Sequence, residues 1–132
     1  MAEFVPHIDE GSRVTFTASA AITGGQLVEV TGNMTVGPAG AASKKVVGVA
    51  SNDAASGAAV VVYCPGPVFD LTATGAIAAG DQVVTAAAGT VATVAAVTTP
   101  TPGDVNNTRA IVGVALEAIA DTAKGRVLFA VV

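Results

Sequence analysis

The feature that most constrains this chain is an internal repeat, which appears when the sequence is slid along itself. Residues 17–28, TASAAITGGQLV, align with residues 72–83, TATGAIAAGDQV, at an offset of 55 positions. A second block, VVGVA at 46–50, aligns with IVGVA at 111–115 at an offset of 65 positions. Because the blocks keep the same order, a chance match within an Ala- and Val-rich sequence is the weaker explanation. The chain is therefore predicted to contain two copies of one structural pattern.

The repeat divides the chain into parts. We expect an N-terminal arm over residues 1–12 and a single β domain over residues 13–132. That domain is built from pseudo-repeated halves at 13–66 and 67–132, packed around one core. The second half carries about ten extra residues, and this excess falls on the stretch 97–107, which reads as a surface loop because it contains two prolines and two adjacent asparagines.

The pattern inside each half is typical of strands. Residues 13–17 alternate polar and apolar side chains, which places Val14 and Phe16 on one face. A hairpin is predicted from 28–30 through the turn Gly32-Asn33 into 34–36. Its counterpart runs from 82–85 through a turn at 86–89 into 90–94. Further apolar runs at 60–63 and 127–130 close the two halves. The predicted fold class is all-β: a compact β-barrel or β-sandwich with at most one short helix.

Two local features complete this prediction. An Ile-x-x-Gly element occurs at 22–25 and again at 77–80, and it places a glycine at a tight turn before each hairpin. The only segment with helical spacing is 115–124, where Leu116, Ile119 and Ala120 share one face and Gly125 follows as a stop. Its counterpart at 51–57 reads as a loop, so one or two helical turns are at stake.

The composition predicts a thin core. Of 132 residues, 28 are Ala and 23 are Val, and only four each are Leu and Phe. Since Ala contributes little area on burial, we expect association with other subunits to add stability.

The net charge is −4, with six basic residues spread along the chain, so no nucleic-acid partner is expected. The sequence begins without a basic, apolar leader, and the uncharged stretch 82–103 is too rich in Ala, Thr and Gly for a membrane helix.

Groups that could carry chemistry are few, and no enzyme activity, cofactor or metal is predicted. The only histidine, His7, lies in the arm, and the only cysteine, Cys64, follows an apolar run, where an inert thiol is the usual state. One His and one Cys do not match the paired ligand spacings of zinc sites. The segment 37–45 resembles a phosphate-binding loop only faintly, because no glycine directly precedes its lysines.

Two elements remain that are predicted to project from the fold. The arm has apolar character, and docking on a neighbouring subunit would supply the contact area that the core lacks. The alternatives are a disordered terminus and a tolerated insertion. The candidate contact residues of the arm are Phe4, Val5, Pro6, His7, Ile8, Asp9 and Glu10, and those of the projecting loop are Thr98, Thr99, Pro100, Thr101, Pro102 and Gly103.

The two repeat blocks, with Val14-Thr15-Phe16-Thr17-Ala18 before them, resemble small capsid decoration proteins, or cement proteins, of tailed double-stranded DNA bacteriophages. The resemblance covers about 14–132. It implies a structural virion protein that assembles as trimers on the outer surface of the head, bridges major capsid subunits and resists the pressure of the packaged DNA. It also places Phe4–Glu10 at the capsid interface and implies addition to heads within the host cytoplasm.

Two other functions stay open at this level. One is a surface-exposed binding module on a virion, for glycans or host-surface adhesion. The other is a small enzyme subunit, because turns of the Ile-x-x-Gly-Asp type also occur in β-clip domains attached to enzymes. The second suffers from the missing catalytic groups.

Overall fold

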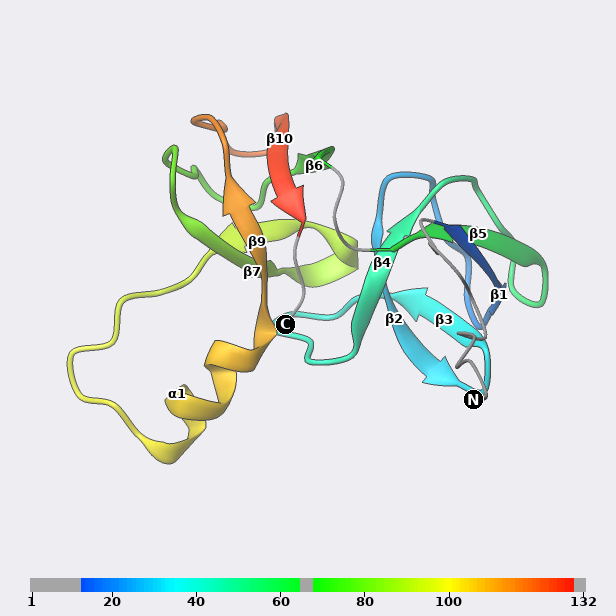
Figure 1. The fold of residues 1–132 in the computed structure, drawn as a ribbon, viewed down its shortest axis with the longest axis horizontal. Coiled ribbons are helices and arrows are strands. Elements are labelled where there is room, and N and C mark those ends of the chain that lie inside the picture. Colours follow the sequence, from blue (N-terminus) through cyan, green and yellow to red (C-terminus); the bar gives the residue numbers. More distant parts are fainter. Residues whose placement is uncertain (1–12, 65–67, 130–132) are drawn as a thin grey trace, which may run out of the picture.

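A computed structural model describes residues 13–64 and 68–129 of the chain, and its regular structure consists mainly of strands (Figure 1). The first half holds five of them: β1 (Arg13–Ala18), β2 (Leu27–Gly32), β3 (Thr35–Pro38), β4 (Val46–Ala50) and β5 (Ala59–Tyr63). The second half holds β6 (Val68–Thr72), β7 (Gln82–Thr85), η1 (Ala87–Gly89), β8 (Val91–Thr93), α1 (Pro102–Asn107), η2 (Thr108–Ala110), β9 (Ile111–Ala115) and β10 (Lys124–Phe129). The predicted all-β class is confirmed.

The first half closes into a barrel with the strand order β1-β3-β2-β4-β5. Strand β1 pairs antiparallel with β5 from Arg13 to Thr17 and parallel with the start of β3, which closes the ring. The predicted β2–β3 hairpin is confirmed, although its turn lies at Asn33 and Met34, one residue later than the pattern indicated, and Gly32 pairs with Thr35. Met34 adopts a positive φ of 48°, so a residue other than glycine takes up the strain of this turn.

The second half repeats the topology of the first, register by register. Its sheet has the order β6-β10-β9-β7-β8, which matches the order of the equivalent strands in the barrel. Both β2–β4 and β7–β9 contain an irregularity at the same place, after Val28 and Val83. The parallel pair Ala18–Val36 that closes the barrel has its equivalent in an isolated parallel bridge, Ala73–Val91. The repeat seen in the sequence is therefore a repeat of strand pairing.

The Ile-x-x-Gly element forms the same turn twice. Gly25 and Gly80 have φ values of +92° and +88°, which only glycine adopts without strain. Each donates its N–H, at 2.8 Å, to the carbonyl oxygen that ends the paired strand, Ala50 or Ala115. In both turns the next side chain, Gln26 or Asp81, accepts a hydrogen bond from the backbone three residues earlier. The prediction of a glycine turn before each hairpin is confirmed.

The helix predicted at 115–124 is wrong. Ile119 instead forms an antiparallel bridge with Ile77, as Ala54 does with Ile22 in the first half. The segment then turns at Asp121 and Thr122, where Thr122 has a φ of 65°. The two backbone hydrogen bonds between Ile119 and Ile77, both 2.8 Å, tie the segment to the connection between β6 and β7. Sheet pairing therefore overrides a short helical spacing of apolar residues.

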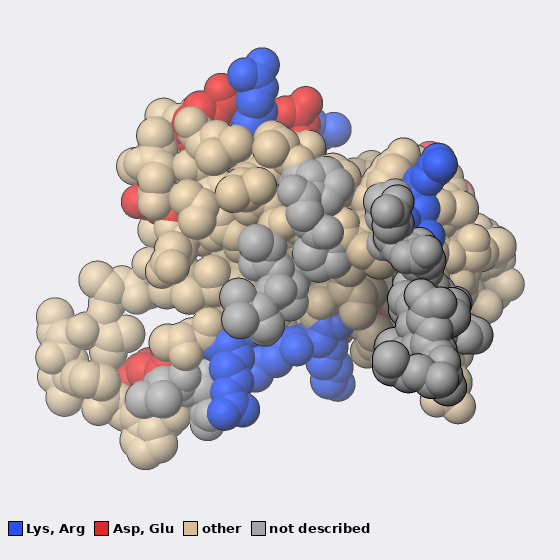
Figure 2. Space-filling model, in the orientation of Figure 1, with Lys and Arg blue, Asp and Glu red and all other residues tan. Residues whose placement is uncertain are grey.

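The helix lies instead inside the ten-residue excess, which the sequence analysis took for a loop. Here α1 is preceded by Thr101 and begins at Pro102, a residue suited to the first helical position. The connection from β8 through α1 extends away from the second sheet as the yellow segment of Figure 1, and Figure 2 shows it standing clear of the body with a hollow beside it. None of the helices within 13–64 and 68–129 has the length and apolar character of a membrane crossing.

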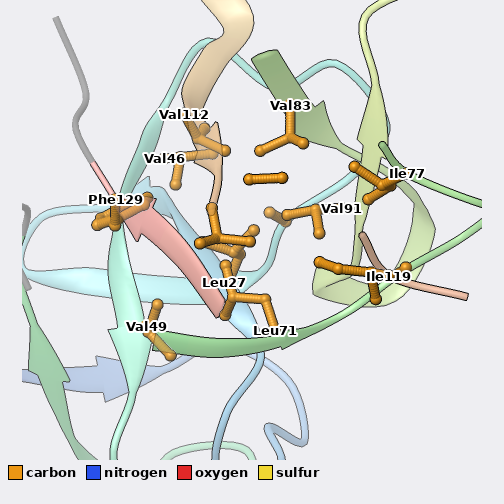
Figure 3. Packing of buried hydrophobic residues seen from close by; sticks show 14 residues of the cluster. Leu27, Val46, Val49, Leu71, Ile77, Val83, Val91, Val112, Ile119 and Phe129 are labelled. Atoms are coloured by element: carbon orange, nitrogen blue, oxygen red, sulfur yellow. The ribbon is translucent and has the colours of Figure 1, made fainter. Parts of the chain in front are cut away.

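The buried residues form two clusters. The smaller fills the barrel and includes Ala18, Ile22, Val28, Val36 and Val62. The larger fills the second half, but it also takes in side chains on the outside of the barrel: Leu27, Ala39, Val46 and Val49. In Figure 3, Leu27 and Val49 lie beside Leu71, and Val46 lies beside Val112. The larger core therefore joins the two halves of the described chain.

Candidate interaction surfaces

The projecting insertion is exposed along the residues predicted from the sequence. Thr98, Thr99, Pro100, Thr101, Pro102 and Gly103 are all exposed to solvent, with the last two in the first turn of α1. Their position away from the sheets is that of a segment available for contact (Figure 1). The contact itself stays a prediction.

A capping box fixes the start of α1. The backbone N–H of Thr101 donates to Asp104 Oδ2 at 2.7 Å, and the Thr101 hydroxyl donates to the same oxygen at 2.8 Å. These two hydrogen bonds, the backbone one first, lower the pKa of Asp104 because they favour its ionised form. The motif Thr-Pro-x-Asp was the signal that could have located this helix in the sequence.

We expect Thr101→Val to raise the pKa of Asp104 part of the way towards its ordinary value, whereas Thr101→Ser should leave it low. The reason is that valine removes the hydroxyl donor and keeps the backbone donor. Because the pKa of the folded state lies below that of the unfolded state, the contribution of Asp104 to helix stability is present above about pH 4 and is lost as the pH falls further. NMR titration of the Asp104 carboxyl group measures its pKa in the wild type and in both variants. The same pKa in all three proteins would contradict the role of the hydroxyl.

A groove lies between the insertion and the second sheet. Its cavity volume is about 360 Å³, and its lining is mainly apolar. The lining residues are Ala42, Val84, Thr93, Val94, Ala95, Val97, Asp104 and Thr108. The loop that supplies Ala42 is held against β7, because Ala42 N donates to Thr85 O at 2.8 Å and Ser43 N donates to Thr85 Oγ1 at 2.9 Å. The groove therefore combines both halves with the insertion.

Basic residues lie close to this groove. Lys44 and Lys45 lie just before β4, and Arg109, 65 positions after Lys44, lies in η2 just before β9. All three are exposed, and Figure 2 shows Lys and Arg side chains gathered at the lower edge of the view, over this part of the molecule. The basic residues are dispersed along the sequence, but the repeat aligns two of them, Lys44 and Arg109.

A second cavity, of about 400 Å³, lies at the seam between the halves. It is lined by Gly24, Gly25 and Gln26 on one side and by Ala88, Gly89 and Thr90 on the other. Gln26 Nε2 donates to Ala88 O at 2.9 Å across the seam, and Gly89 N donates to Ala39 O at 3.0 Å. These bonds tie the η1 corner to β2 and its neighbours, so the cavity is part of the joint between the halves.

The reactive groups named from the sequence do not come together in the described ranges. Cys64 is partly buried at the end of β5, and this burial raises the pKa of its thiol. His7 lies outside the described residues. Within 13–64 and 68–129, no group of three or more His, Cys, Asp or Glu side chains is placed to hold a metal ion. The carboxylates of Asp53 and Asp121 instead accept backbone hydrogen bonds from Gly24 and Gly75.

The arm residues Phe4, Val5, Pro6, His7, Ile8, Asp9 and Glu10 also lie outside the described residues. The described chain starts at Arg13, which is exposed at the beginning of β1 and pairs with Tyr63.

Tandem barrel-like halves around a joint core, with an exposed insertion on the second half, define this chain as a small all-β protein with repeated architecture. A family model described as phage cement protein matches residues 8–131. The chain belongs to this family, and the resemblance stated from its repeat blocks is confirmed. It is thus a structural protein of a phage virion.

A solved structure with the same fold comes from the head of another phage. The chain is similar to the N base of head fiber gp8.5 of bacteriophage phi29, with a TM-score of 0.63 and 17% sequence identity over 89% of this chain and 92% of that chain. At this identity the likeness shows the fold alone. A comparison with curated proteins found no match.

Proposed function

We propose that this protein binds the outer surface of a phage head as trimers and stabilises the lattice of the major capsid protein, without catalytic turnover. The observation that carries the proposal is the match to the phage cement family, which extends over nearly the whole chain. The phi29 head fiber base, which shares the fold, is named as a component of a phage head. Addition to heads would take place in the host cytoplasm.

The division of the chain supports this role. We infer an arm over residues 1–12 followed by a single domain over 13–132, because one apolar cluster takes in side chains from both halves. A rigid domain with an apolar, acidic arm can hold a lattice by many weak contacts. Repetition over the head then makes a modest affinity per site sufficient.

Two elements are proposed to contact the capsid. The first is the arm, Phe4–Glu10, with Phe4, Val5 and Ile8 as apolar anchors. The second is the exposed insertion at 98–103, which stands away from the sheets and starts the capped helix α1. Exposed Thr and Pro side chains in such a segment suit contacts with a neighbouring protein.

Deleting residues 2–10 is expected to lower the affinity for undecorated heads at least tenfold, which corresponds to about 1.4 kcal/mol per site. The measurement is co-sedimentation of the purified protein with undecorated heads of its phage at increasing concentration. A matched control replaces residues 2–10 by a Gly/Ser segment of equal length, which separates loss of side chains from loss of length.

The possible outcomes separate the parts of the proposal. Full occupancy after the deletion would contradict the role of the arm while leaving head binding intact. A full-length protein that does not sediment with heads at any concentration would contradict head binding itself.

The adhesion alternative is not favoured by the described structure. Glycan sites are commonly lined by aromatic rings, and neither of the two cavities described above is lined by one.

A further inference from the structure

The outward face of the second sheet carries a continuous row of side chains across neighbouring strands. Val68 lies opposite Leu128, Leu128 lies opposite Val114, and Val114 lies opposite Gln82. Val94 completes the row, since its N–H donates to Gln82 O at 3.0 Å. Directly opposed residues in adjacent strands point to the same face of a sheet. Four of these five side chains are apolar, so the row forms an apolar strip.

This row is open to solvent in the isolated chain. Val68 is 49% exposed and Leu128 is 39% exposed, and none of the five residues is buried. The row runs on into the groove beside the insertion, because Val94 lines that groove. An exposed apolar strip across a whole sheet is a feature of interaction surfaces rather than of ordinary monomer surfaces.

The first half contains the same row, and three of its five residues are buried there. The positions 55 or 65 residues earlier are Arg13, Tyr63, Val49, Leu27 and Ala39, and they are paired in the same order. Leu27, Ala39 and Val49 are only 0%, 1% and 3% exposed, because they belong to the core shared with the second half. Tyr63 packs against Phe69 of β6, with ring centroids 5.8 Å apart. Most of this row is thus part of the joint between the halves.

We propose that the outward row of the second half, here called the open row, is the contact surface for a second copy of this chain. The proposal rests on the trimer put forward above and locates one of its surfaces. The reason for choosing a second copy is continuity with the joint inside the chain. In the first half, most of the equivalent row is already buried against a neighbouring repeat unit, the second half of the same chain. Every copy of the chain carries a repeat unit of this kind, so a second copy can cover the open row.

The joint within the chain also indicates which part of the second copy fits. There, the η1 corner covers the row: a Cβ at Gly89 would lie 2.7 Å from Leu27 O, so the backbones nearly touch. The equivalent corner of the first half is the tip of the β2–β3 hairpin, where Met34 is 56% exposed. Met34 has a side chain where Gly89 has none, so the hairpin tip cannot approach a strand as closely as Gly89 approaches Leu27. The contact between copies is therefore looser than the joint within the chain, and the Met34 side chain is its apolar anchor.

The two surfaces lie far apart on one molecule. Figure 1 shows the hairpin tip of β2 and β3 at the lower right and the sheet of β6, β10, β9 and β7 at the upper left. A contact between them joins copies head to tail. Such heterologous contacts close into a ring when the rotation between copies allows it, which suits a trimer and not a two-fold dimer.

The test is self-association of the full chain in solution, without heads, by sedimentation equilibrium. Wild type is expected to associate at concentrations up to about 1 mM, and Leu128→Lys and Met34→Lys are each expected to weaken association at least tenfold. The matched control is Ala58→Lys, which adds the same charge at an exposed turn outside both surfaces. Val68→Lys, on the edge strand, repeats the test of the open row should Leu128→Lys fail to fold.

Mixing the variants tests the head-to-tail geometry. An equimolar mixture of Leu128→Lys and Met34→Lys chains retains one intact contact, so it should form dimers but no closed ring. A wild type that stays monomeric at about 1 mM, or variants that associate like wild type, would overturn the proposal. Since no heads are present, these outcomes are independent of whether the protein binds a capsid.

Discussion

Replacing Gly113 with alanine is expected to lower the free energy of unfolding by at least about 3 kcal/mol. A Cβ at this position would lie 2.1 Å from the carbonyl oxygen of Leu128 and 3.2 Å from Val127 Cγ1. The obstacle is backbone of the neighbouring strand β10, which cannot swing aside as a flexible side chain would. The alanine must therefore push β9 and β10 apart, in the middle of a sheet that both strands help to form.

Gly48 should respond in the same way, because it occupies the equivalent place in the barrel. Its Cβ would lie 2.1 Å from Tyr63 O and 2.6 Å from Val62 Cγ1. Neither glycine is among those with a positive φ, so the effect comes from lack of space and not from backbone conformation. For a protein whose total stability is about 5–15 kcal/mol, either substitution removes a large share of it.

Urea unfolding followed by circular dichroism measures the loss. The matched control is Gly40→Ala, because nothing lies within 4 Å of a Cβ built there. This control is expected to change stability by less than about 0.5 kcal/mol. Loss of stability at Gly40 as large as at Gly113 would mean that any added methyl group is harmful, and the argument from close strand approach would then be wrong.

Gly48 and Gly113 lie in the repeat blocks, and the repeat is the part of the fold that the sequence predicts best. The repeated VVGVA and IVGVA blocks were visible from identity alone, and the structure pairs each with the equivalent strands of its own half. Hairpins and glycine turns were also predictable, since alternation of side chains and the need for positive φ are local properties. Whether the second half closes fully was not predictable, because closure there depends on a single parallel bridge between Ala73 and Val91.

The helix prediction failed for an instructive reason. Leu116, Ile119 and Ala120 have helical spacing, but Ile119 has a partner in Ile77, more than 40 residues away in the chain, which local periodicity does not reveal. For the insertion the error was the reverse, because a loop was predicted and the structure has the helix α1. Its Pro and Gly residues suggested a loop, while the Thr101–Asp104 capping box that supports a short helix is a finer signal.

Candidate surfaces were harder to predict than the fold. The insertion could be located because it interrupts the repeat, and its residues 98–103 are exposed in the structure. The open row was missed because it is composed of residues from separate strands and becomes visible only through their register. Val68 and Leu128, for example, are 60 positions apart in the sequence and directly opposite each other in the sheet.

The second large effect is expected from Leu27→Ala, which should lower the free energy of unfolding by about 2–5 kcal/mol. Leu27 lies on the outside of the barrel, yet it is fully buried because the second half packs on it. Figure 3 shows it beside Leu71 near the centre of the shared core. Truncation removes its contacts with both halves at once and leaves a cavity that the backbone around Gly89, already close to Leu27, has little freedom to fill.

The repeat supplies a matched control in Gln82→Ala. Gln82 occupies the equivalent place in β7 but is exposed, so this change is expected to alter stability by less than about 0.5 kcal/mol. Native-state hydrogen exchange gives a sharper measurement than a melting curve. If the shared core makes the two halves one cooperative unit, Leu27→Ala should reduce the protection of amides in β6 and β10 by the same factor as in β2. Protection lost in the barrel alone would show that the halves unfold separately and that Leu27 does not join them.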